Sequence, residues 1–227
     1  MSLIVAALAL AGCDGAAPQQ ANAVAAESVR PPAGPERLVV AFGDSLYAGY
    51  GLKPAESWPA KLQAALWAKG INAKLVNAGV SGDTTAAGRQ RLAFLLDSQP
   101  RKPDLVIVGL GGNDMLRGLS AAEARANLDA ILSELDRRGI PAMLTGMLAA
   151  PNLGADYARE FNAMYPALAK QYGAALVPFF MASVIDQPKL FQPDRVHPTA
   201  AGIDAIVADT VDEVASAISA AAPPPPR

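Results

Sequence analysis

Short apolar runs alternate with longer segments of helical periodicity between Arg37 and Ser219. A run of about five apolar residues bounded by turn residues is typical of a buried strand, whereas apolar residues spaced three and four apart form one face of a helix. Strands that alternate with helices assemble into a parallel sheet, because each helix carries the chain back across the sheet. We therefore predict one α/β domain over residues 37–219.

Five strands are expected, over residues 38–42, 73–77, 105–110, 142–147 and 174–177. One intervening helix opens with a capping box, Ser120-x-x-Glu123, and ends at Gly139. A final helix places six aliphatic residues on one stripe, which predicts a core-facing surface. These elements indicate a five-stranded, parallel, doubly wound sheet of the flavodoxin type in three αβα layers. The six residues of the stripe are Ile203, Ile206, Val207, Val211, Val214 and Ile218.

The two ends of the chain differ in composition from this domain. Residues 14–36 are rich in Ala, Pro, Gln and Gly and are expected to form a flexible tether, and residues 220–227 form a Pro-rich tail. Residues 1–13 contain an apolar run of signal-peptide length, Leu3 to Leu10, although no Lys or Arg precedes it. We predict export of the protein.

The end of that first segment, Leu10-Ala-Gly-Cys13, resembles a bacterial lipoprotein box. The resemblance implies that Cys13 is lipidated and tethers the protein to a membrane. Cys13 is the sole cysteine, so it has no disulfide partner within the chain. The expected location is periplasmic or membrane-anchored, in a bacterium. An export signal with a chance cysteine is the alternative.

Charge and composition exclude some classes of function. The chain has 19 basic and 21 acidic residues, a net charge of −2 and no basic block, so nucleic acid is not an expected partner. One histidine and one cysteine leave no cluster of imidazole and thiolate ligands, so no metal site is predicted and no cofactor is expected. The oligomeric state is not set by the sequence.

Polar residues and glycines follow three of the predicted strands. The three segments are Gly43-Asp-Ser45-Leu46, Ala78-Gly79-Val-Ser-Gly-Asp83 and Gly111-Gly-Asn113-Asp114. In open α/β sheets, ligands bind beyond the carboxyl ends of the strands. The segment entering the last helix adds Asp194 and His197, so four segments are expected to converge at one edge.

The residue types in these segments fit acyl transfer. Ser45 is a candidate nucleophile that needs a base, and His197 is the only histidine in the chain. Asp194, three residues earlier, is a candidate to orient the imidazole. The Ser45 and Gly79 N–H groups and the Asn113 amide are candidates for an oxyanion hole, which stabilises the negative oxygen of the reaction.

These four segments resemble, in order, the four motif blocks of the SGNH (GDSL-type) hydrolases. Longer stretches, such as FGDSLYAGYGL and GLGGNDMLRGL, are similar to the bacterial thioesterase I/arylesterase/lysophospholipase subgroup, from about Leu38 to Ala217. The resemblance implies the SGNH hydrolase fold and a serine ester hydrolase acting on small acyl or aryl esters and thioesters. Within 147–154 the pair Ala149-Ala150 departs from the subgroup, where a larger or charged residue is expected.

Two other functions are compatible with the same candidate site residues. A carbohydrate or peptidoglycan O-acetylesterase would use the same triad, and a non-catalytic binding lipoprotein would use the same edge as a ligand pocket. Six apolar loop residues are candidates for the lining of an acyl groove, with ordinary loop packing as the alternative. They are Leu110, Leu116, Leu119, Leu148, Leu153 and Phe179.

Overall fold

A computed structural model of the chain describes residues 30–221. The predicted export segment, Cys13, the tether up to residue 29 and the tail from residue 222 lie outside this range. The strands are β1 (Arg37–Gly43), β2 (Ala73–Gly79), β3 (Leu105–Gly109), β4 (Ala142–Thr145) and β5 (Ala175–Val177). The helices are α1 (Ser45–Ala48), α2 (Trp58–Ala68), α3 (Thr85–Asp97), α4 (Gly112–Leu116), α5 (Ala121–Arg137), α6 (Ala155–Tyr172) and α7 (Ala200–Ala220). Three short 3₁₀ helices cover Pro54–Glu56, Pro151–Leu153 and Pro188–Leu190.

All neighbouring strands of the sheet are parallel, in the order β2-β1-β3-β4-β5. This is the flavodoxin-type order, in which the direction of winding reverses between β1 and β3. The predicted fold class and five strands are confirmed, with shifts at the strand ends. β2 continues to Gly79, and β3 stops before Leu110, whose carbonyl oxygen accepts a hydrogen bond from the Tyr165 hydroxyl instead.

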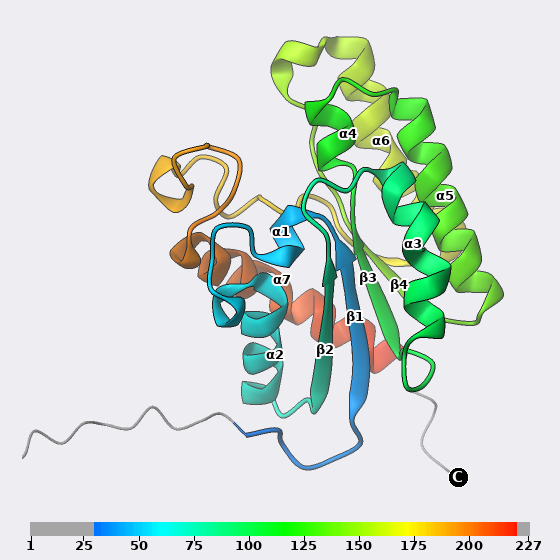
Figure 1. The fold of residues 1–227 in the computed structure, drawn as a ribbon, viewed down its shortest axis with the longest axis vertical. Helices are drawn as coiled ribbons and strands as arrows, with labels where there is room; N and C mark the ends of the chain where they lie inside the picture. Colours follow the sequence, from blue (N-terminus) through cyan, green and yellow to red (C-terminus); the bar gives the residue numbers. More distant parts are fainter. Residues whose placement is uncertain (1–29, 222–227) are drawn as a thin grey trace, which may run out of the picture.

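The alternation of side chains along β1 divides the core into two halves. Val40 and Phe42 pack with α3, α5 and α6, whereas Val39 and Ala41 pack with α2 and α7. Successive residues of a strand point to opposite faces of the sheet, so a strand covered on both faces is apolar throughout. The two helical layers are visible on either side of the strands in Figure 1.

Of the two predicted helix features, the stripe on α7 is found in full and the capping box of α5 only in its Ser120 half. Ser120 caps α5 by accepting a hydrogen bond from the Glu123 N–H at 3.3 Å, and all six residues of the predicted stripe on α7 are buried. α2 packs beside α7, where the Trp58 indole N–H donates to the Thr210 hydroxyl at 3.3 Å. None of the helices within residues 30–221 has the length and apolar character needed to cross a membrane.

Both ends of the described chain lie at the amino edge of the sheet. β1 begins there at Arg37, and residues 33–35 and Arg37 share a surface hollow with Ile218 and Ser219 near the end of α7. α7 runs from the carboxyl edge, where it follows His197, down to this amino edge (Figure 1). The chain therefore enters and leaves the domain on the side opposite to the turns predicted to hold the site.

Candidate active site

A cavity of about 720 Å³ lies at the carboxyl edge of the sheet. Its lining includes Ser45 after β1, Gly82 after β2, Asn113 after β3, and His197 before α7. The cavity spans the point between β1 and β3 at which the winding reverses, where open α/β sheets bind ligands. The predicted convergence of four chain segments is therefore observed.

Ser45 is held in place by a tight turn between β1 and α1. Asp44 caps the short helix, because its carboxylate accepts a hydrogen bond from the Leu46 N–H at 3.0 Å. Gly43 lies against the Tyr47 ring and the Gly109 carbonyl, and a Cβ at this position would come within 2.8 Å of both. Glycine at position 43 therefore lets the Ser45 turn pack directly on β3.

Ser45, His197 and Asp194 form a continuous hydrogen-bonded chain. The His197 Nε2 lies 2.8 Å from the Ser45 Oγ, and the His197 Nδ1 lies 2.7 Å from the Asp194 Oδ2. Asp194 also accepts hydrogen bonds from the His197 and Val196 N–H groups, at 3.0 and 2.9 Å. The His197 N–H bond is the main reason that the pKa of Asp194 falls to about 2, so this carboxylate is ionised at neutral pH.

The cavity wall includes backbone N–H groups that are free to donate, among them those of Ser45 and Gly82. Ser45 and Gly82 both line the cavity, and within the described chain neither N–H has an acceptor. Gly82 adopts a φ of +87°, a conformation that favours glycine. Unpaired N–H groups in the wall of a cavity that also holds a serine hydroxyl can stabilise a negatively charged oxygen.

Gly79 does not occupy the predicted place. Its N–H donates to the Asn77 Oδ1 at 3.0 Å, and Gly79 is not part of the cavity lining. The prediction assigned the first glycine after the expected end of β2, but the strand continues to Gly79, so the turn begins only at Val80. Gly82 is the glycine that reaches the cavity, and its place three residues beyond the strand was the signal that sequence reasoning missed.

Gly79 has a packing role instead, and this leads to a testable prediction. A Cβ at Gly79 would overlap the Ala48 backbone nitrogen and come within 2.8 Å of the Asp44 carbonyl oxygen. Because backbone atoms cannot rotate away, Gly79→Ala is expected to push α1 off the sheet and to destabilise the protein by about 1–3 kcal/mol. Thermal denaturation with an ester hydrolysis assay measures this, and a variant as stable and active as wild type would contradict the packing role.

Asn113 points its amide into the same region from the first turn of α4. Its Nδ2 donates to the Asp83 carbonyl oxygen at 2.9 Å and lies 3.3 Å from the Asp44 Oδ2. The first bond fixes the orientation of the amide, and the second is long enough to yield to a better acceptor in the cavity. The predicted residues Ser45, Asn113, Asp194 and His197 are thus brought together.

The buried Asp44 carboxyl group has an unusual pKa. Only 4% of Asp44 is exposed, and desolvation raises the pKa to about 6, against the lowering effects of the Leu46 N–H and the His197 charge. The neighbouring Asp83 and Asp114 charges add to the increase. A raised pKa in the folded state means that the stability that Asp44 provides is complete below about pH 4 and is lost as the pH rises through 6.

This linkage predicts the sign of a pH effect. Asp44→Asn removes the titration, so the melting temperature of the variant minus that of wild type is expected to be more positive at pH 7 than at pH 4. Any effect of the substitution on stability that does not depend on pH cancels when the two pH values are compared. Thermal denaturation at both pH values measures the difference, and an unchanged or reversed difference would contradict the raised pKa.

Arg91, which was not predicted, stabilises the turns that follow β1 and β2. Its guanidinium pairs with the Asp83 carboxylate, donates to the Gly43 carbonyl oxygen at 2.9 Å and lies 4.2 Å from the centre of the Phe42 ring. Arg91 therefore ties the segment that accepts the Asn113 bond to the end of β1. Nothing in the spacing of Asp83 and Arg91 along the chain indicated this pairing.

The wall of the cavity is largely apolar. Of the six predicted groove residues, Leu116, Leu148 and Phe179 line it. The prediction was wrong for Leu110, which is buried in the core. The other two also lie outside the lining, since Leu119 is partly exposed elsewhere and Leu153 packs against the α5–α6 side of the core. The larger side chains of the lining that were not predicted include Tyr50, Met115, Met147, Met181, Ile185, Phe191 and Val196.

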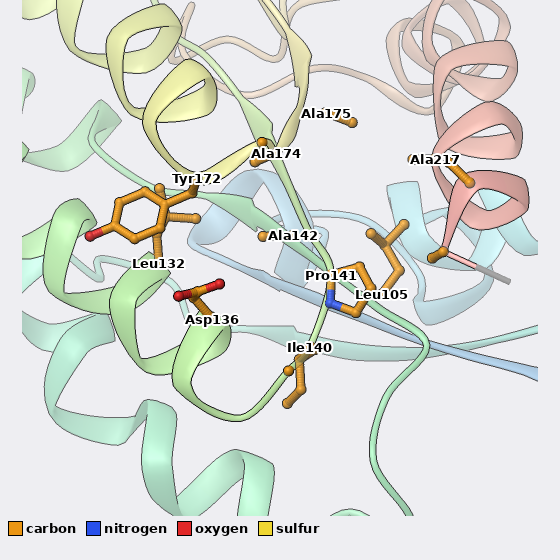
Figure 2. Close-up of a pocket in the computed structure, with 14 residues that line it drawn as sticks. Leu105, Leu132, Asp136, Ile140, Pro141, Ala142, Tyr172, Ala174, Ala175 and Ala217 are labelled. Atoms are coloured by element: carbon orange, nitrogen blue, oxygen red, sulfur yellow. The ribbon is translucent and has the colours of Figure 1, made fainter. Parts of the chain in front are cut away.

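A second cavity, of about 450 Å³, lies at the opposite edge of the sheet. It is bordered by the first residues of β3, β4 and β5, namely Leu105, Ala142 and Ala175. Figure 2 shows Asp136 and Tyr172 as the polar side chains among those labelled there. Among the described residues that line it there is no serine, histidine or asparagine, so the chemistry predicted from the sequence belongs to the larger cavity.

The chain matches known proteins over most of its length. The model of the GDSL-like lipase/acylhydrolase family matches residues 41–205. Esterase TesA of Pseudomonas aeruginosa is 39% identical over 165 residues, which are 73% of this chain and 81% of that protein. Thioesterase 1/protease 1/lysophospholipase L1 of Escherichia coli is 38% identical over 157 residues, which are 69% and 73% of the two chains.

A solved structure is more similar in sequence. The crystal structure of AlinE4, an SGNH-hydrolase family esterase, is 62% identical, covers 82% of this chain and 98% of its own, and superposes with a TM-score of 0.70. The three-layer fold and the clustering of the four chain segments agree with that likeness. The protein belongs to the GDSL-like lipase/acylhydrolase family and is a serine ester hydrolase of the SGNH type.

Proposed function

We propose that the enzyme cleaves carboxylic esters and thioesters through an acyl-enzyme on Ser45. The Ser45 Oγ attacks the carbonyl carbon while His197 Nε2 takes the hydroxyl proton. The C–O or C–S bond then breaks, and His197 gives the proton to the leaving alcohol or thiol. Water, deprotonated by His197, attacks the acyl-enzyme in the same way and releases the acid. The 2.8 Å distance between Ser45 Oγ and His197 Nε2 is the observation that carries this proposal.

Asp194 is proposed to orient His197 and to stabilise its charged form. A carboxylate on Nδ1 leaves Nε2 as the proton acceptor that faces Ser45. The carbonyl oxygen becomes negative in the tetrahedral intermediate, and we assign its stabilisation to the N–H groups of Ser45 and Gly82 and the Asn113 amide. Gly82 takes the place first assigned to Gly79, because Gly82 lines the cavity with an unpaired N–H, whereas the Gly79 N–H is bonded to Asn77 and Gly79 lies outside the lining.

The shape of the cavity favours an acyl chain longer than acetate. Its lining is mainly apolar, and Leu116, Leu148 and Ile185 remain 59%, 45% and 50% exposed, so a bound hydrocarbon chain would cover them. Ala149 and Ala150 border the same space with small side chains. Short to medium fatty acyl esters, including thioesters and lysophospholipids such as those named for the E. coli relative, are the proposed substrate class.

A fluorophosphonate probe followed by an acyl-chain series tests this function. We expect labelling of wild type and none of Ser45→Ala, and we expect kcat/KM for p-nitrophenyl esters to rise from acetate to a medium chain. Each CH₂ buried in the cavity contributes about 0.8 kcal/mol at most, or roughly a fourfold gain. Labelling that does not depend on Ser45 would contradict the mechanism, and a maximum at acetate would favour an O-acetylesterase.

The location of the enzyme is a separate proposal. We infer export and attachment to a membrane through a lipid on Cys13, from the apolar run and the Leu10–Cys13 motif. Metabolic labelling with palmitate is expected to mark the full-length protein and not Cys13→Ser. Equal labelling of the two proteins would contradict lipidation at Cys13. If wild type is not labelled but is found outside the cytoplasm in soluble form, export is supported and the lipid attachment is contradicted.

A further inference from the structure

Gln192 lies between the segment that carries Ser45 and the segment that carries His197. Its side-chain Nε2 donates to the Tyr50 carbonyl oxygen at 2.7 Å and to the Pro198 carbonyl oxygen at 2.9 Å. Its backbone N–H donates to the His197 carbonyl oxygen at 2.7 Å. Both amide protons of the side chain are therefore used, one on each segment.

These bonds close a ring that contains the Ser45–His197 contact. The Ser45 carbonyl oxygen accepts a hydrogen bond from the Tyr50 N–H at 3.1 Å, and Tyr50 is bonded in turn to Gln192. Gln192 is bonded to the His197 carbonyl oxygen, and His197 Nε2 returns to Ser45 Oγ. The Tyr50 ring packs against the imidazole, with 4.4 Å between ring centres and a tilt of 34°.

The neighbouring backbone is shaped to admit the Gln192 side chain. Gly51 has a φ of +72°, and a Cβ at this position would overlap the Gln192 Oε1. Glycine thus allows the amide to reach the Tyr50 carbonyl. The pairing matters because Ser45 and His197 lie 152 positions apart in the chain and on different elements, so their distance is set by contacts between the two segments.

We propose that Gln192 is a positioning residue, which holds His197 at hydrogen-bond distance from the Ser45 hydroxyl. Gln192 is absent from the lining of the cavity, so it acts through the two segments and not on the substrate. A displacement of about 1 Å between a base and its nucleophile can lower the rate about 100-fold. This inference rests on the proposed roles of Ser45 and His197.

The test uses Gln192→Glu and Gln192→Met, which keep the length of the side chain and remove the amide donor. Gln187→Glu is the matched control, because Gln187 lies in the same segment and its amide donates only to the Ser183 carbonyl oxygen. We expect both Gln192 variants to lower kcat by about 10- to 100-fold with KM within about twofold of wild type. The rate of fluorophosphonate labelling should fall by the same factor, and Gln187→Glu should match wild type.

Several results would overturn the proposal. They are kcat values for the Gln192 variants equal to that of Gln187→Glu, or a higher KM at unchanged kcat, which would assign Gln192 to substrate binding. Gly51→Ala gives a second route if the Gln192 variants unfold, because it leaves Gln192 in place and displaces its amide; full activity in this variant also overturns the proposal. His197→Ala distinguishes failure of the proposed mechanism from failure of the role of Gln192. If His197→Ala remains active, the proposed mechanism fails, whatever the Gln192 variants show.

Discussion

Replacing His197 by alanine is expected to lower kcat for ester hydrolysis by about 10²- to 10⁴-fold. The reason is that Ser45 has one imidazole within reach, and its hydroxyl is a weak nucleophile without a base to take the proton. The Asp194 carboxylate is bonded to the opposite ring nitrogen and to two backbone N–H groups, so it is not placed to replace the lost base. Steady-state kinetics with a p-nitrophenyl ester measures the loss.

The fold of this variant should survive, which makes the result interpretable. His197 lies at the surface of the carboxyl edge, and the turn around it keeps its backbone bonds from the residue 196 and 197 N–H groups to Asp194. We expect a melting temperature close to that of wild type. A variant that folds normally and hydrolyses esters at more than one tenth of the wild-type rate would contradict the role of His197 as the base.

The second large effect is expected for Asn113→Ala, with a loss of about 10²- to 10³-fold in kcat. The amide is proposed to donate to an oxygen that is negative only during the reaction, so its loss should change kcat much more than KM. The Ser45 and Gly82 N–H groups remain, which is why some activity should persist. Kinetic constants for the variant and wild type, measured on the same ester, separate the two effects.

Asn113 also fixes a neighbouring segment, so stability must be measured in parallel. Its Nδ2 donates to the Asp83 carbonyl oxygen, and loss of that bond is expected to cost about 1 kcal/mol. This cost lowers the melting temperature but leaves the kcat of the folded enzyme unchanged. Hydrolysis at the wild-type rate by Asn113→Ala would remove Asn113 from the proposed oxyanion hole.

The fold was predictable because local patterns and tertiary packing agree. Continuous apolar runs such as residues 38–42 are expected for strands covered on both faces, and the stripe on α7 faces the core as its spacing indicated. The ends of strands were less predictable. β2 extends to Gly79 because its backbone pairs with β1 up to Gly43, and this pairing is not visible in the residues of β2 alone.

The site was predictable where function requires a particular side chain. No other histidine competes with His197, and Ser45 and Asn113 stand at strand ends, so residue type and position pointed the same way. Gly82 was missed because the expected end of β2 placed the first turn glycine at Gly79; the strand continues through Gly79, and Gly82 is the glycine that lies beyond it and lines the cavity. Arg91 and Gln192 act on carbonyl oxygens of distant segments, which no local pattern records.

The opposite positions of the chain ends and the cavity determine how the enzyme faces any surface to which it is fixed. Arg37 and Ala220 lie at the amino edge of the sheet, and Ser45 opens at the carboxyl edge (Figure 1). Attachment directly at Arg37 or Ala220 would leave the mouth of the cavity directed away from the support. An enzyme immobilised directly at either of these residues should therefore keep its turnover.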